Sequence, residues 1–89
     1  MLTMTTSERV LKVLHNYEGI DASQVTGDNC SLTEALGLDS LDALELCFFL
    51  EEEFGITIDE TNEAPTLQTF GDVVAMVERK LSETVGRAA

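Results

Sequence analysis

The stretch Gly37-Leu38-Asp39-Ser40-Leu41-Asp42 decides the fold, because it predicts the start of a long acidic helix. Asp39 is a favourable N-cap residue, and Asp42 adds negative charge in the first turn, where the helix dipole stabilises it. Apolar residues continue at helical spacing to Phe54, and Gly55 follows as a C-terminal stop. We therefore predict a helix from about Ser40 to Phe54, with Ser40 at its N-terminal end.

This helix carries apolar residues on two opposite sides when residues are placed at about 100° intervals. One side is predicted to face the core and consists of Ala43, Leu46, Cys47, Leu50 and Phe54. The other side carries three large apolar residues, Leu41, Leu44 and Phe48, with three acids around them, Glu45, Glu51 and Glu52. Apolar residues ringed by acids and turned away from the core predict an interaction patch. The alternative is that the preceding connection folds over this stripe.

The rest of the chain predicts three further helices, one of them short. Thr5-x-x-Glu8 is a capping box that opens a first helix, and Gly19 ends it. Thr69-x-x-Asp72 opens a last helix, which Gly86 is expected to end. The predicted apolar positions of these two helices are Val10, Leu11, Leu14, Tyr17, Val73, Val74, Val77 and Leu81. Asp59 to Glu63 is predicted as a short helix that ends before Pro65.

Two connections link these helices. The first is long, from Ile20 to Leu38, with a single turn expected at Ser31-Leu32-Thr33-Glu34. Its predicted apolar anchors are Ile20, Val25, Leu32, Ala35 and Leu36. The second, Ile56-Thr57-Ile58, alternates like a strand without a partner and is predicted as extended chain. The result is an all-α fold, a small four-helix bundle with one short helix, in a single domain of residues 1–89 whose ends (1–4, 84–89) are expected to fray.

The charge distribution restricts the class of partner. The net charge is −12, and Val13 to Glu78 contains no lysine or arginine. Such a negative field argues against nucleic acid and anionic membranes and favours basic protein partners. The alternative is that the acids only keep a small protein soluble. We expect a monomer without a nucleic-acid or membrane partner.

The cysteines and the N-terminus predict a cytoplasmic protein. The two cysteines, Cys30 and Cys47, are fewer than a secreted mini-protein of this size usually carries. No apolar run approaches the ~18 residues of a membrane span, and Met1-Leu2-Thr3-Met4 lacks the features of a signal peptide.

Catalytic chemistry is not expected. His15 is the only histidine and is predicted on a solvated face of the first helix, and no Cys/His spacing suggests a metal site. We therefore predict that the chain is not an enzyme and is instead a substrate of other enzymes.

Ser40 has two interpretations. An Asp-Ser pair before an apolar helix is most often only a helix cap. A helix N-terminus also favours phosphate, through its N–H groups and the positive end of its dipole, so a phosphodiester on Ser40 would lie in a compatible field. Gly37 leaves space for a partner's backbone, and Leu41 offers an apolar contact beside the serine.

The chain closely resembles the acyl carrier protein family. The resemblance rests on Leu36-Gly37, Asp39-Ser40-Leu41-Asp42 and Leu50-Glu51-Glu52-Glu53-Phe54-Gly55, and continues more weakly from Thr66 to Leu81. It implies that a phosphopantetheinyl transferase installs 4'-phosphopantetheine from coenzyme A on Ser40, and that the thiol of this arm holds thioester cargo. The positions that match those contacted by partner enzymes are Leu41, Asp42, Leu44, Glu45, Phe48, Glu51 and Glu52. Asp39 is expected both to cap the helix and to pair with a partner's cation.

The cargo stays open. Gly37-Leu38 before Asp39-Ser40 is more similar to fatty-acid and polyketide carriers than to peptidyl carriers, but Cys47-Phe48-Phe49 is bulkier than usual and Gly27-Asp28 adds length. The resemblance implies a carrier for fatty-acid, polyketide or specialised lipid synthesis, with a cargo-loading ligase or synthase and acyl-transfer enzymes as partners, and a small apolar cavity between the helices. The alternatives are a carrier of an activated amino acid and an unmodified acidic adaptor that binds through Leu41, Leu44 and Phe48.

Overall fold

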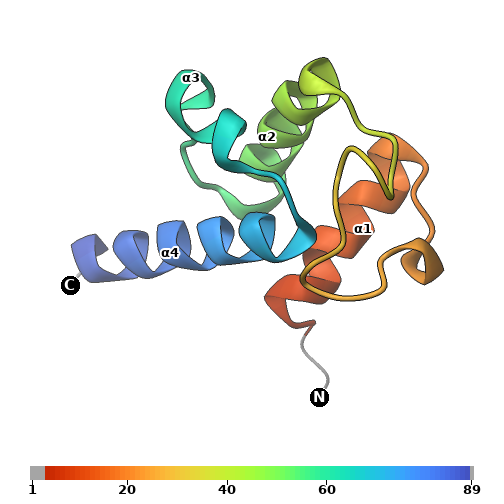
Figure 1. The fold of residues 1–89 in the computed structure, drawn as a ribbon. Helices are drawn as coiled ribbons and strands as arrows, with labels where there is room; N and C mark the ends of the chain where they lie inside the picture. Colours follow the sequence, from red (N-terminus) through yellow and green to blue (C-terminus); the bar gives the residue numbers. More distant parts are fainter. Residues whose placement is uncertain (1–3, 89) are drawn as a thin grey trace.

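Four helices lie in the described part of the chain, residues 4–88 (Figure 1). The computed structural model describes residues 4–88 and the side chains of residues 4–83. The helices are α1 (Thr6–Glu18), α2 (Ser40–Phe54), the short α3 (Glu60–Glu63) and α4 (Phe70–Ala88), and two 3-10 turns lie at Ala22–Gln24 and Ala64–Thr66. No strand occurs within the described range 4–88. The predicted all-α fold with one short helix is therefore confirmed, whereas most of the predicted frayed ends lie outside the described side chains.

Reciprocal hydrogen bonds set the helix starts that the sequence predicts. The Thr5 N–H donates to Glu8 Oε1 at 2.7 Å, and Thr5 Oγ1 accepts from the Glu8 N–H at 3.1 Å. Thr69 and Asp72 make the same exchange at the start of α4. The predicted end of the last helix was wrong, because α4 continues through Gly86 to Ala88. Glycine lowers helix propensity by only about 1 kcal/mol and keeps its N–H, so it does not enforce a stop.

The core lies where α1, α2 and α4 meet, and the later part of α4 extends beyond the other helices (Figure 1). Its fully buried residues are Val10, Val13, Leu14, Leu46, Cys47, Leu50, Val73 and Val77. Tyr17, which recurs at helical spacing with Val10 and Leu14, does not join them in the core, because this side chain is 53% exposed. Its ring packs on another ring at the surface, and Val13 takes the inner position instead.

The long first connection is fixed to the start of α4, which the sequence did not indicate. Ser31 and Thr69 form an isolated antiparallel bridge. Beside it, the Phe70 N–H donates to the Cys30 carbonyl at 2.9 Å, and the Gly71 N–H donates to the Asp28 carbonyl at 2.8 Å. Ile20, Leu32 and Leu36 are buried as predicted and Val25 partly so, whereas Ala35 is exposed because it lies on the outside of the turn at residues 31–36.

The second connection places α3 opposite the start of α2. Ile56 and Ile58 are buried and Thr57 is exposed, as their alternation predicts. Asp59 caps α3, whose last residue, Glu63, precedes a 3-10 turn that contains Pro65. The Glu63 carboxylate also pairs with two cations of α4, Arg79 at 3.0 Å and Lys80 at 2.9 Å. These ion pairs hold α3 against α4.

Candidate functional site

The N-terminus of α2 exposes Ser40 and is capped by other residues. The Asp42 N–H donates to Asp39 Oδ1 at 2.9 Å, and the Asp39 N–H donates to Asp42 Oδ2 at 3.0 Å. The cap is therefore Asp39, and the Ser40 hydroxyl is not needed for it. Gly37 has a φ of 72°, in the left-handed region that favours glycine. The backbone conformation that leads into α2 therefore explains why a glycine stands here.

An open pocket of about 430 Å³ lies beside Ser40. Ser40, Ala43 and Leu44 of α2 form one wall, and the first connection and α3 with the following turn form the others. The remaining lining residues are Leu32, Thr33, Leu38, Asp39, Glu60, Thr61, Ala64, Pro65 and Leu67. Ala43, predicted for the core face, is only partly buried because it faces this pocket. The pocket is mainly apolar, with acids at Asp39 and Glu60.

The outer stripe of α2 is exposed as predicted. Leu41 is 63% exposed, Phe48 is 54% exposed and Leu44 is 39% exposed, whereas Leu46 and Leu50 on the opposite side are fully buried. The first connection therefore does not cover the stripe, and the alternative in which it does is wrong. Leu44 is the least exposed of the three because it also lines the pocket.

The predicted acids of α2 differ in how they are used. Glu45 and Glu52 are exposed. Glu51 is half-buried, and its Oε2 accepts a hydrogen bond from the Ile58 N–H at 2.7 Å. This carboxylate therefore anchors the connection to α3. Asp42 is half-buried at the start of the helix, where it completes the cap.

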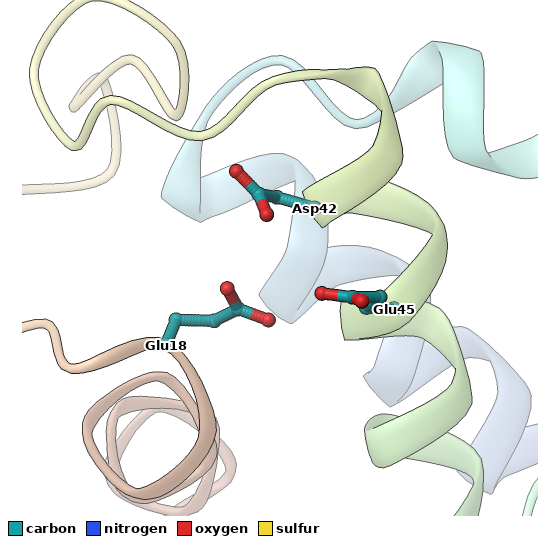
Figure 2. Close-up of side chains that lie close together, drawn as sticks. All are labelled: Glu18, Asp42 and Glu45. Carbon is teal, nitrogen blue, oxygen red and sulfur yellow. The ribbon is translucent and has the colours of Figure 1, made fainter.

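Three carboxylates converge between α1 and α2 (Figure 2). Glu18 comes from the end of α1, and Asp42 and Glu45 from the first turns of α2; one oxygen of each lies within 4.8 Å of the other two. Glu18 Oε2 is buried, and no described residue donates a hydrogen bond to it. Burial, and then the negative charges of Asp42, Glu45 and Asp39, raise the pKa of Glu18. The sequence did not suggest this cluster, because Glu18 lies outside the predicted α2 site.

Three aromatic rings continue the same surface. The Tyr17 ring of α1 stacks on the Phe49 ring of α2, with 4.0 Å between centroids and 9° between planes. The Phe48 ring meets Phe49 edge-on at 6.2 Å. The sequence indicated only Phe48 as a surface contact. The adjacent Phe49 was a signal that more aromatic surface lies toward α1.

The histidine and the two cysteines, side chains that often serve in catalytic or metal sites, are in contact with the backbone or buried. The exposed His15 ring places Nδ1 3.2 Å from the Ile20 carbonyl oxygen, in agreement with its predicted solvated position. Cys30 and Cys47 are buried free thiols. Burial, followed by Glu60, Glu51 and Glu63, raises the pKa of Cys47 to about 11, so this thiol stays protonated at neutral pH. In the described part of the chain, no helix is both long enough and apolar enough to cross a membrane.

Comparison with protein families agrees with this geometry. The family model described as a phosphopantetheine attachment site matches residues 8–77, which include α1, α2, α3 and the start of α4. Domains of this family carry 4'-phosphopantetheine covalently and are carriers rather than catalysts. They interact with phosphopantetheinyl transferases and with acyl-handling enzymes. The chain therefore belongs to the family of phosphopantetheine attachment-site domains, which includes the acyl carrier proteins.

Proposed function

We propose that Ser40 carries the 4'-phosphopantetheine arm and that the protein presents acyl thioesters to enzymes of fatty-acid, polyketide or specialised lipid synthesis. One observation carries the proposal: Ser40 is exposed at the N-terminus of α2 and at the same time lines the apolar pocket. An arm attached to Ser40 starts at the protein surface, where enzymes can reach it. The apolar pocket beside Ser40 can shelter the cargo.

The residues around Ser40 fit a phosphodiester. The N-terminus of α2 provides the positive end of the helix dipole, which favours an anion at this place. Asp39 would repel a phosphate, but its Oδ1 accepts from the Asp42 N–H and is held toward the cap. The exposed Leu41 leaves the approach to Ser40 open from the outer side.

The chain's own part in the chemistry is small. The arm supplies the thiol that holds the cargo as a thioester. Ser40 contributes its Oγ, which forms a bond to the phosphorus next to the pantetheine of coenzyme A. The pyrophosphate P–O bond to the nucleotide breaks, the adenosine bisphosphate leaves, and the hydroxyl proton of Ser40 goes to a base. The ring of His15 lies on α1, where its Nδ1 contacts the Ile20 carbonyl oxygen, and it is not at Ser40. We therefore assign the base for this step to the transferase.

The pocket supports acyl cargo over an amino acid. Its volume of about 430 Å³ lies within the range of about 300–1,000 Å³ typical of small-molecule sites. Leu32, Leu38, Leu44 and Leu67 contribute apolar surface to its walls. An aliphatic chain gains by leaving water for such a surface, whereas a charged ammonium group loses hydration there. A carrier of an activated amino acid is the second candidate.

The outer face of α2 is proposed as the docking face for basic partners. It combines the exposed stripe Leu41, Leu44 and Phe48 with the exposed acids Glu45 and Glu52. Asp39, Asp42 and Glu51 also match family contact positions, but each is already bonded to the backbone of this chain. We therefore assign electrostatic steering mainly to Glu45 and Glu52. Free cysteines are typical of a reducing compartment, so we also propose a cytoplasmic location. We further propose that the carrier is a monomer.

Intact mass tests the proposal directly. Co-expression with a phosphopantetheinyl transferase should add the mass of one arm to the wild-type chain and nothing to Ser40→Ala. A wild-type chain that stays unmodified would support the unmodified acidic adaptor, which binds through Leu41, Leu44 and Phe48 without an arm. The mass of the group trapped on the carrier in its native cell then separates an acyl from an amino-acyl cargo.

A further inference from the structure

We propose that the phosphopantetheinyl transferase docks across the junction of α1 and α2, placing an arginine between Glu18, Asp42 and Glu45 and an apolar side chain on the Tyr17, Phe49 and Phe48 rings. We call these six residues the α1–α2 seam. The proposal rests on the proposed function, because it concerns the enzyme that modifies Ser40. It extends the docking face from α2 onto α1.

The aromatic half of the seam leaves two large rings in contact with solvent. Tyr17 and Phe48 are each more than half exposed, and Phe49 lies between them in contact with both rings. Phe49 also packs against the core, but Tyr17 and Phe48 lie outside it, because Leu46, Cys47, Leu50 and Phe54 already bury the inner side of α2. Large apolar groups that stay in water beside charged groups are typical of a surface that a partner covers.

The acidic half of the seam concentrates negative charge that would be stabilised by a bound cation. Three carboxylates repel one another within 4.8 Å, and the buried Glu18 Oε2 has no donor among the described residues. The cations whose ion pairs are seen in the structure, Arg9, Arg79 and Lys80, bind Glu53 or Glu63 elsewhere. A partner would therefore bring its cation to carboxylates that these ion pairs of the described residues do not reach.

Arginine fits both halves better than lysine. Its planar guanidinium carries five N–H donors in a fork that matches carboxylate oxygens, and it also stacks on aromatic faces. On α2, Glu45 lies three residues before Phe48 and four before Phe49, so carboxylate and rings are neighbours on the helix surface. From α1, the Tyr17 ring stacks on Phe49, and a Glu18 carboxylate oxygen lies within 4.8 Å of those of Asp42 and Glu45. One side chain can therefore meet carboxylates and an aromatic edge together.

The transferase is the partner whose position is most constrained. It acts on Ser40 itself, so it has to cover the first turns of α2, whereas later enzymes act at the far end of a flexible arm. A stable interface buries about 800 Å² on each partner, which is wider than the stripe of a single helix. An enzyme over Ser40 and Leu41 therefore extends onto a neighbouring element, and the acids and rings of the seam favour the α1 side.

Equilibrium binding to the transferase without coenzyme A tests the seam without any transfer reaction. Glu18→Gln keeps the shape of the side chain and removes its charge, and Tyr17→Ala removes the outer ring. We expect the Kd to rise about fivefold in Glu18→Gln and about tenfold in Tyr17→Ala, since anchors of this kind dominate small interfaces. The effect of Glu18→Gln should shrink at high salt, because screening weakens the ion pair.

Matched controls separate docking from general effects. Glu78→Gln removes an exposed acid from α4, and Asn16→Ala truncates an exposed neighbour of Tyr17 on α1. Both variants should keep the Kd within about twofold, as surface changes outside the interface do. Thermal melts show whether each variant is folded, and Glu18→Gln tests the seam even if Tyr17→Ala loosens α1.

The outcomes are distinguishable. If the transferase modifies the wild-type chain but binds Glu18→Gln and Tyr17→Ala as tightly as wild type at low salt, the seam proposal is wrong and the proposed function stands. If the transferase neither binds nor modifies the wild-type chain, the proposed function itself is wrong.

Discussion

Asp39 and Asp42 each accept a hydrogen bond from the other's backbone N–H, at 2.9 Å and 3.0 Å, across the first turn of α2. The turn is thereby closed on both sides of Ser40 without the Ser40 hydroxyl. An exposed serine whose side chain is not required for capping is available for covalent modification.

We expect Ser40→Ala to keep its free energy of unfolding within about 0.5 kcal/mol of wild type, as exposed residues without a structural role do. Asp39→Ala should instead lose about 0.5–2 kcal/mol, because it removes the cap. Urea unfolding of both variants checks this. A loss in Ser40→Ala as large as in Asp39→Ala would show that the serine also caps α2.

Phe48 and Leu50 provide a test of the two-sided α2. Phe48→Ala should change the free energy of unfolding little, because 54% of this side chain is already exposed. Leu50→Ala, fully buried, should cost about 2–5 kcal/mol. Denaturant unfolding gives both values, and transfer of the arm to Phe48→Ala should be slower than to wild type. Equal destabilisation in the two variants would contradict the exposed stripe.

The acidic cluster predicts a pH-dependent stability difference. The pKa of Glu18 in the folded state is raised above its ordinary value of 4.5, by burial first and by Asp42 next. The folded state therefore holds this proton more tightly, so the stability contributed by Glu18 is full below pH 4.5 and is lost as the pH rises through the raised pKa. Glu18→Gln should be more stable than wild type at neutral pH, and the difference should vanish in acid.

Thermal melts of wild type and Glu18→Gln from about pH 4 to pH 8 measure this difference, with the exposed Glu78→Gln as the control that should show no comparable trend. A difference that stays constant over this range would mean that Glu18 does not titrate with a raised pKa. If Glu18→Gln is more stable than wild type at neutral pH and also binds the transferase more weakly, then Glu18 serves docking rather than folding.

Glu51 and Glu52 are adjacent, but their substitutions should differ. Glu51→Gln weakens the bond to the Ile58 N–H, which involves a half-buried carboxylate, and should destabilise by about 1–2 kcal/mol. Glu52→Lys should change stability by less than about 0.5 kcal/mol, yet raise the KM of the transferase for the carrier at low salt. Unfolding and transfer kinetics on both variants check the distinction. Unchanged KM values in both Glu52→Lys and Glu45→Lys would exclude this face as the docking site.

Gly71 lies where the first connection meets α4. A Cβ atom at this position would lie 2.8 Å from Asp28 Cβ and 2.9 Å from the Asp28 carbonyl oxygen. Gly71→Ala should therefore displace the connection and cost about 1–3 kcal/mol, as overpacking does. Chemical shifts of Asp28 and Cys30 should change with the loss of stability. A variant as stable as wild type would show that this junction is not held tightly.

The helix boundaries of α1 and α2 follow from short-range chemistry. Thr5 with Glu8, and Asp39 with Asp42, close their turns within three residues, and Gly19 and Gly55 end the helices with φ values of 70° and 67°. The two sides of α2 were also predictable, because helical periodicity alone separates Leu50 from Phe48. Gly86 shows the limit of this reasoning, since a glycine permits a helix end without requiring one.

The sequence by itself determined the helices, the exposed position of Ser40 at a helix start and the acidic apolar face beside it, because these depend on residues a few positions apart. Only the tertiary structure decided the pocket, which needs Leu32 and Leu67 brought to Ala43, and the seam, which needs α1 laid against α2. The physical reason is that Tyr17 meets Phe49, and Glu18 meets Asp42, through packing between helices. Packing of this kind depends on the shape of the whole core, and no local pattern of residue types records it.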